Sequence, residues 1–84
     1  SGYMITFGSE NADYVKAITG IKVNNTDYKP GSFNTDNQYS STVKTGDLSL
    51  NETAFTETKN TITIHATGYT DLTLTITKDG KLAQ

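Results

Sequence analysis

The chain has 84 residues, of which 33% are apolar and 19% are charged, and its formal net charge is -2 at pH 7. This length allows one domain, and the lack of cysteine excludes disulfides and cysteine-ligated metals. The seven basic residues are all lysine and lie scattered along the chain, so we expect no nucleic-acid partner. No apolar run reaches the roughly 18–20 residues of a membrane-spanning helix, so we expect no direct membrane insertion.

The N-terminal part of the chain predicts one strand and one short helix. Residues 3–7 alternate, which is typical of a strand with one buried face. Residues 11–18 predict a helix of about two turns, with Asn11 as the N-cap and Gly20 closing it. Tyr14 begins an apolar stripe along this helix, so the helix is expected to plug one end of the fold or to cross over it.

The middle of the chain predicts a hairpin and two further strands. Residues 21–28 predict a tight hairpin around an asparagine-rich turn. Residues 32–38 predict a loop, and residues 39–43 and 48–50 predict short strands. Residues 51–59 predict a loop or one helical turn capped by Asn51.

The last third of the chain carries the clearest pattern. Residues 61–67 and 72–76 both alternate between apolar and threonine side chains, and a four-residue turn containing Gly68 separates them. This pattern predicts a β-hairpin. The whole chain therefore predicts a mainly β fold, a small β-sandwich or open barrel of six or seven short strands with one short helix near the N-terminus.

Catalytic chemistry is poorly supported by the sequence. His65 is the only histidine, and strand alternation places it on the outward, threonine-rich side of its strand. Without a second histidine or a cysteine, a nucleophile lacks an evident base and a metal has few possible ligands. We therefore expect a protein that is not an enzyme and that holds no cofactor.

Aromatic residues are the best candidates for recognition. Tyr28, Phe33 and Tyr39 flank the predicted loop, and exposed tyrosine is a favoured anchor in protein interfaces. Asn37 in the loop and Tyr14 on the helix complete the predicted protein-binding set. A structural alternative places Tyr14 in the core, together with other aromatic residues: Phe7, Phe55 and Tyr69.

Three stretches of the chain form a recognisable order: an aromatic-to-threonine run at residues 14–19, the hairpin at residues 21–28 and a closing run at residues 60–72. In this order they resemble the haemoglobin-interacting domain family of Gram-positive haem-acquisition receptors. The most specific part is the Ala-Thr-Gly-Tyr-Thr-Asp sequence within the last of these. The chain departs from the family pattern at Ile21, where valine is usual, and at Asn25, where glycine is common.

The resemblance implies a module that captures host haemoglobin by protein–protein contact and does not itself ligate haem. It also implies an extracellular position at a bacterial cell surface, and we expect residues 1–84 to be a single domain of a larger multidomain surface protein. Neighbouring domains of that parent protein would then be partners. The alternative is a structural spacer or a glycan-binding accessory module of a surface adhesin or cell-wall enzyme.

Overall fold

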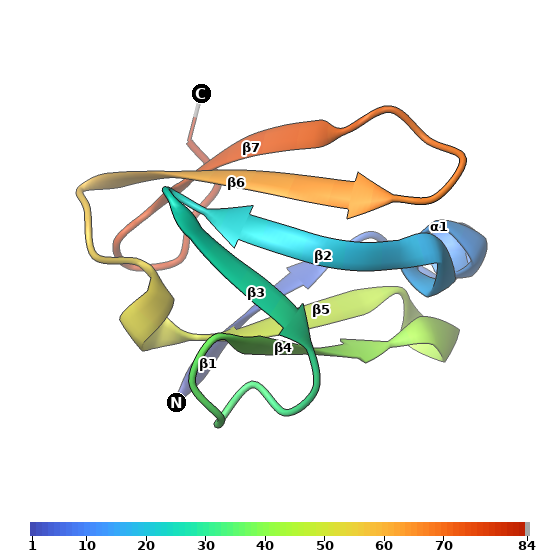
Figure 1. Ribbon diagram of the computed structural model, residues 1–84, viewed down its shortest axis with the longest axis horizontal. Coiled ribbons are helices and arrows are strands. Elements are labelled where there is room, and N and C mark those ends of the chain that lie inside the picture. Colours follow the sequence, from blue (N-terminus) through green and yellow to red (C-terminus); the bar gives the residue numbers. More distant parts are fainter. Residues whose placement is uncertain (84) are drawn as a thin grey trace.

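The computed structural model describes residues 1–83 and shows a curled, half-barrel sheet of seven strands with one short α-helix (Figure 1). The order across the sheet is β1-β5-β4-β3-β2-β6-β7, and all neighbours are antiparallel except β3 and β4. The strands are β1 (Gly2–Thr6), β2 (Ile18–Val23), β3 (Thr26–Pro30), β4 (Gln38–Thr42), β5 (Asp47–Asn51), β6 (Lys59–Ala66) and β7 (Leu72–Thr77). The predicted mainly β fold is confirmed, in its open-barrel form.

The predicted C-terminal hairpin is confirmed as the β6–β7 pair. Six residue pairs join the two strands, from Lys59 opposite Thr77 to Ile64 opposite Leu72. The alternation that predicted the hairpin also decides burial, because every second residue of β6 from Asn60 to Ala66 is buried. The threonine faces of both strands consequently point away from the core.

The predicted hairpin of residues 21–28 is the β2–β3 pair, with Val23 opposite Thr26 across the turn. Asn24 adopts a φ of 54°, a conformation that asparagine tolerates better than most residues. Both the backbone and the side chain of Asn24 bond the backbone of Thr61 on β6. The hairpin turn is therefore fixed to the neighbouring strand as well as to its own.

The helix α1 (Ala12–Ala17) is shorter than predicted, and a 3₁₀ turn at Ser9–Asn11 precedes it. The predicted capping role of the Asn11 side chain is wrong, because its amide donates a hydrogen bond to the Phe7 carbonyl oxygen at 2.7 Å. Ile18 leaves the helix because it pairs with Ala66 as the first residue of β2. Gly20 accordingly lies inside β2 and does not end the helix.

The connections around β5 are formed by short 3₁₀ turns. The turn Val43–Thr45 replaces the predicted last residue of the fourth strand and ends at Gly46, which has a φ of 73°. After β5, the turn Glu52–Ala54 is capped by Asn51, whose side-chain oxygen accepts a hydrogen bond from the Thr53 N–H at 3.0 Å. The predicted capping by Asn51 is therefore confirmed.

The core fills the inside of the curled sheet and is closed at one end by α1, which packs against β6 and the turn Val43–Thr45. Partly buried aromatic residues cover its margin, and Tyr3 stacks on Phe55 with ring centroids 5.3 Å apart. The buried apolar side chains are Val15, Ile18, Ile21, Val23, Tyr39, Leu48, Leu50, Ala54, Phe55, Ile62, Ile64, Ala66 and Ile76.

Candidate functional site

The loop between β3 and β4 is held in a fixed shape by its own hydrogen bonds. The Gln38 side-chain oxygen accepts from the Ser32 N–H at 3.1 Å, and the Ser40 hydroxyl accepts from the Phe33 N–H at 2.8 Å. Asn37 adopts a φ of 60°, and its carbonyl oxygen accepts from the Lys29 N–H at 2.9 Å. These hydrogen bonds fix the backbone conformation of the loop, and with it the positions of the loop's polar side chains.

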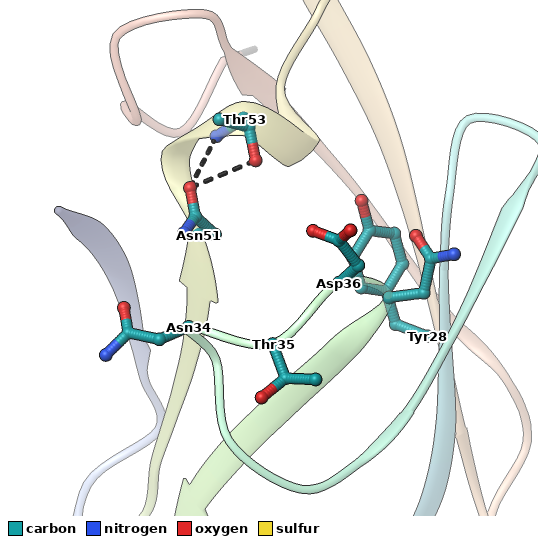
Figure 2. A pocket seen from close by; sticks show the side chains of 7 residues that line it. Tyr28, Asn34, Thr35, Asp36, Asn51 and Thr53 are labelled. Atoms are coloured by element: carbon teal, nitrogen blue, oxygen red, sulfur yellow. Dashed lines mark hydrogen bonds between the residues drawn. The ribbon is translucent and has the colours of Figure 1, made fainter.

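A polar hollow of about 170 Å³ lies between this loop and the start of the turn after β5 (Figure 2). On one side of the hollow, the Asn51 side-chain oxygen accepts hydrogen bonds from both the N–H and the hydroxyl of Thr53. We call it the loop hollow, and it is lined by Tyr28, Asn34, Thr35, Asp36, Asn37, Asn51 and Thr53.

Tyr28 also borders a second, wider hollow of about 590 Å³ over β2 and its neighbours. We call this the strand hollow, and it is lined by Thr19, Gly20, Ile21, Lys22, Asp27, Tyr28, Lys29, Thr63, His65 and Asp71. Tyr28 is among the lining residues of both hollows, and we call their combined lining the Tyr28 band.

A bulge in β2 lies within the strand hollow. Ile18 lies opposite Ala66 and Gly20 lies opposite His65, so β2 has one residue more than β6 between these pairs. A bulge turns the strand locally and changes which side chains face outward. Gly20 has no side chain to fill the space beside His65, and a Cβ there would have 4.0 Å to its nearest neighbour, the Tyr28 carbonyl oxygen.

Two pairs of polar side chains line the strand hollow. The His65 Nδ1 is 2.8 Å from the Asp71 carboxylate, and the Lys22 ammonium is 3.9 Å from the Asp27 carboxylate. All four side chains are more than half exposed. Such exposed pairs contribute little to stability, so they are free to take part in contacts with a partner.

Tyr28 is half-buried, and its ring lies beside Asp36 (Figure 2). Burial, followed by the negative charge of Asp36, raises the pKa of the Tyr28 phenol above its usual value. The hydroxyl therefore stays protonated at neutral pH and can donate as well as accept a hydrogen bond.

The structure brings only two of the predicted site residues together, Tyr28 and Asn37 in the loop hollow. Phe33 is half-buried and packs on the start of β1, where a Cβ added to Gly2 would lie 2.7 Å from its ring. Tyr39 is only 1% exposed, so its predicted place on the binding surface is wrong. The physical reason is alternation along β4, which turns Tyr39 inward between Gln38 and Ser40.

Tyr14 lies in an aromatic cluster that is separate from the Tyr28 band. Its ring meets Phe7 at 5.3 Å and Tyr69 at 4.9 Å between centroids, both edge to face. Its hydroxyl is buried, and no hydrogen-bond partner for it occurs within residues 1–83. Burial, then the charges of Asp71 and Tyr69, raises the pKa of Tyr14. Tyr69 is 48% exposed, so it is not the core residue that the structural alternative assumed.

Sequence reasoning missed the residues that the strand hollow adds to the site. Alternation correctly placed His65 on the outer side of its strand, but nothing near it in sequence points to Gly20 as a neighbour. That proximity depends on the antiparallel pairing of β2 with β6, which the bulge shifts by one residue. Asp71 was the one sequence feature that could have indicated this site. It ends the turn that follows the His65 strand, and such a turn can bring a carboxylate back beside that strand.

The Tyr28 band offers an aromatic side chain among hydrogen-bonding and charged groups, which is suited to noncovalent recognition. Within residues 1–83, no three or more histidine, aspartate or glutamate side chains gather as they would around a metal ion. The same part of the chain contains no helix with the length and apolar character needed to cross a membrane.

Comparison with known proteins identifies the family. A search of curated proteins finds no match to the chain. A family profile described as "Heme-binding protein Shr-like, Hb-interacting domain" matches residues 1–78, which is nearly the whole chain. The resemblance inferred from residues 14–28 and 60–72 is thereby confirmed. The chain belongs to the haemoglobin-interacting domain family of Shr-like haem-binding proteins.

Proposed function

We propose that this domain captures host haemoglobin by protein–protein contact, for haem and iron acquisition at a bacterial cell surface. The observation that carries the proposal is the family match over residues 1–78. In this proposal the parent protein is extracellular and carries neighbouring domains that receive the haem. The domain itself acts as a binding module and catalyses no reaction.

We place the contact surface on the Tyr28 band. Tyrosine at an interface combines a rigid apolar ring with a polar tip, and Tyr28 is the residue that both hollows have in their lining. Lys29 and Asp71 add charges of both signs to the lining of the strand hollow. A surface of this size would bury about 1,200 Å² in total, at the low end for specific interfaces.

Haem ligation by this domain does not fit its residues. His65 is the only histidine, and its side chain is 63% exposed with Nδ1 directed at Asp71. The hollow beside it is lined mainly by threonine, glycine and charged residues, which would leave a haem ring largely in water. Tyr28 is also unsuitable, because a raised pKa opposes the phenolate that iron ligation requires. The proposed partner is therefore the haemoglobin protein surface.

Replacing Tyr28 by alanine is expected to weaken haemoglobin binding about 10- to 100-fold, as for a central tyrosine of an interface. Tyr69→Ala is the matched control, because Tyr69 is an exposed tyrosine outside both hollows. Affinity would be measured by biolayer interferometry on immobilised haemoglobin, with circular dichroism to verify that both variants are folded. Unchanged binding by Tyr28→Ala together with lost binding by Tyr69→Ala would move the interface to the aromatic cluster.

Glycan binding is a second candidate, favoured by one observation. The loop hollow combines an aromatic ring with carboxylate and amide groups, from Tyr28, Asp36 and Asn37. However, Tyr28 is the one aromatic residue lining this hollow, whereas a sugar is commonly held between several polar groups and a broad apolar surface. A glycan array probed with the labelled domain distinguishes the two functions, since haemoglobin capture predicts no carbohydrate hits.

A further inference from the structure

The curled sheet remains open along a seam between its first and last strands, β1 and β7. At one end of the seam, the Tyr3 hydroxyl donates to the Lys78 carbonyl oxygen at 3.2 Å. At the other end, Phe7 after β1 and Tyr69 before β7 both pack on Tyr14. The two strands bordering the seam therefore run in opposite directions.

The edge of β1 that faces the seam has free backbone groups. The Phe7 N–H donates to Gly46 and the Ser1 carbonyl oxygen accepts from Glu52, so the odd-numbered residues of this strand turn their backbone groups toward β5. In an antiparallel pair the hydrogen-bonded positions alternate. The backbone groups of Met4 and Thr6 consequently point into the seam.

The edge of β7 is already partly paired with an extended segment. After a turn at Lys78–Gly80 the chain reverses, so that the Thr77 N–H donates to Lys81 and the Ala83 N–H donates to Thr75, both at 2.8 Å. Leu82 forms an antiparallel bridge with Ile76 between these bonds. The next position on this edge is Thr73, which pairs with Thr63 of β6 on its other side and has no strand partner on the seam side among residues 1–83. The seam thus holds a short piece of strand and has room for its continuation.

Between these edges lies an apolar hollow of about 320 Å³. Met4 is 65% and Leu82 is 67% exposed, and they are two of the three large apolar side chains that the described part of the chain leaves in solvent. None of the residues of the Tyr28 band lines this hollow. Its lining residues are Met4, Ile5, Thr6, Phe7, Leu74, Ile76, Gly80 and Leu82.

We propose that this seam binds an extended segment of a partner polypeptide, which adds as a strand antiparallel to β7 and parallel to β1. The segment would carry apolar side chains at alternate positions, because only alternate side chains of a strand face the hollow. The unpaired backbone groups of β1, together with those at the start of β7, favour an added strand over a helix, whose own groups are already bonded. The Lys81–Ala83 segment, seated on the same edge, demonstrates the geometry.

A peptide of sequence Lys-Thr-Val-Thr-Val-Thr-Lys serves as the probe, titrated into the ¹⁵N-labelled domain. Binding is expected to shift the amide resonances of Met4, Thr6, Thr73 and Thr75. The control peptide is N-methylated at alternate residues, which removes backbone donors but keeps the side chains. Equal shifts with both peptides, or shifts confined to the Tyr28 band, would overturn the proposal.

A tethered version avoids the entropic cost that weakens short free peptides. Appending Thr-Val-Thr-Val-Thr after Gln84 is expected to slow amide exchange at Thr6 and Thr73 about tenfold relative to an appended Ser-Gly-Ser-Gly-Ser. Met4→Lys, at an exposed side chain, is expected to abolish that protection without altering haemoglobin affinity. Identical exchange in the two extended chains would refute strand addition at the seam, whatever the outcome with haemoglobin.

Discussion

Gly46→Ala is expected to lower the free energy of unfolding by about 2–4 kcal/mol. Gly46 adopts a φ of 73°, where a side chain costs roughly 1 kcal/mol. A Cβ at this position would also lie 2.0 Å from the Gly8 carbonyl oxygen and 2.6 Å from its carbonyl carbon. These are backbone atoms, which cannot rotate aside, so the chain must shift at a cost of about 1–3 kcal/mol more.

Gly68→Ala is the matched control for this prediction. Gly68 has a similar φ of 84°, but a Cβ there would meet nothing within 4 Å. The expected loss is therefore the conformational cost alone, about 1 kcal/mol. Urea unfolding of the two variants measures the difference, and equal losses would show that the approach of Gly8 to Gly46 does not constrain the fold.

Asn60→Ala is expected to cost about 3 kcal/mol, which lowers Tm by roughly 12–24 °C for a domain of this size. Asn60 is the fully buried polar side chain of β6, at 0% exposure. Its oxygen accepts from the Glu57 N–H and the Asn24 amide, and its amide donates to the carbonyl oxygens of Glu57 and Ile76, all within 3.0 Å. Alanine would leave these groups without partners in a region that excludes water.

Asn25→Ala provides the control, because Asn25 is an exposed asparagine in the turn that Asn24 ties to β6. The free energy of unfolding of Asn25→Ala is expected to lie within about 0.5 kcal/mol of that of the unsubstituted domain. Asn60→Asp keeps the two acceptor contacts and loses the donors, and it buries a charge. If thermal unfolding gave the same Tm for Asn60→Ala and Asn25→Ala, that result would contradict the stabilising role of the Asn60 hydrogen bonds.

The strands could be predicted from the sequence where the alternation of apolar and polar side chains is enough to define them. The β6–β7 hairpin and the β2–β3 hairpin follow from side-chain period and turn residues, which are local properties. The end of α1 could not be predicted in this way, because Ile18 continues an apolar helical stripe. Its pairing with Ala66, a contact between distant residues, overrides that pattern.

The candidate site was less predictable than the fold because it depends on strand order. β3 and β4 pair in parallel over two residues, with Tyr39 opposite Pro30, and Tyr39 lies on the inward face of β4. Of the predicted binding residues, Tyr28 and Asn37 lie together in the loop hollow. The strand hollow lies at the bulge opposite His65. The sequence pattern within one strand does not predict which partner strand a bulge will face.

We expect this domain to bind the haemoglobin protein and not free haem. Isothermal titration of the domain with human haemoglobin, beside a titration with haem alone, tests it directly. The expected result is saturable heat with haemoglobin at a micromolar Kd, about -8 kcal/mol of binding free energy, and no saturable heat with haem. Absence of haemoglobin binding at about 100 μM, a free energy weaker than roughly -5.5 kcal/mol, would contradict the claim.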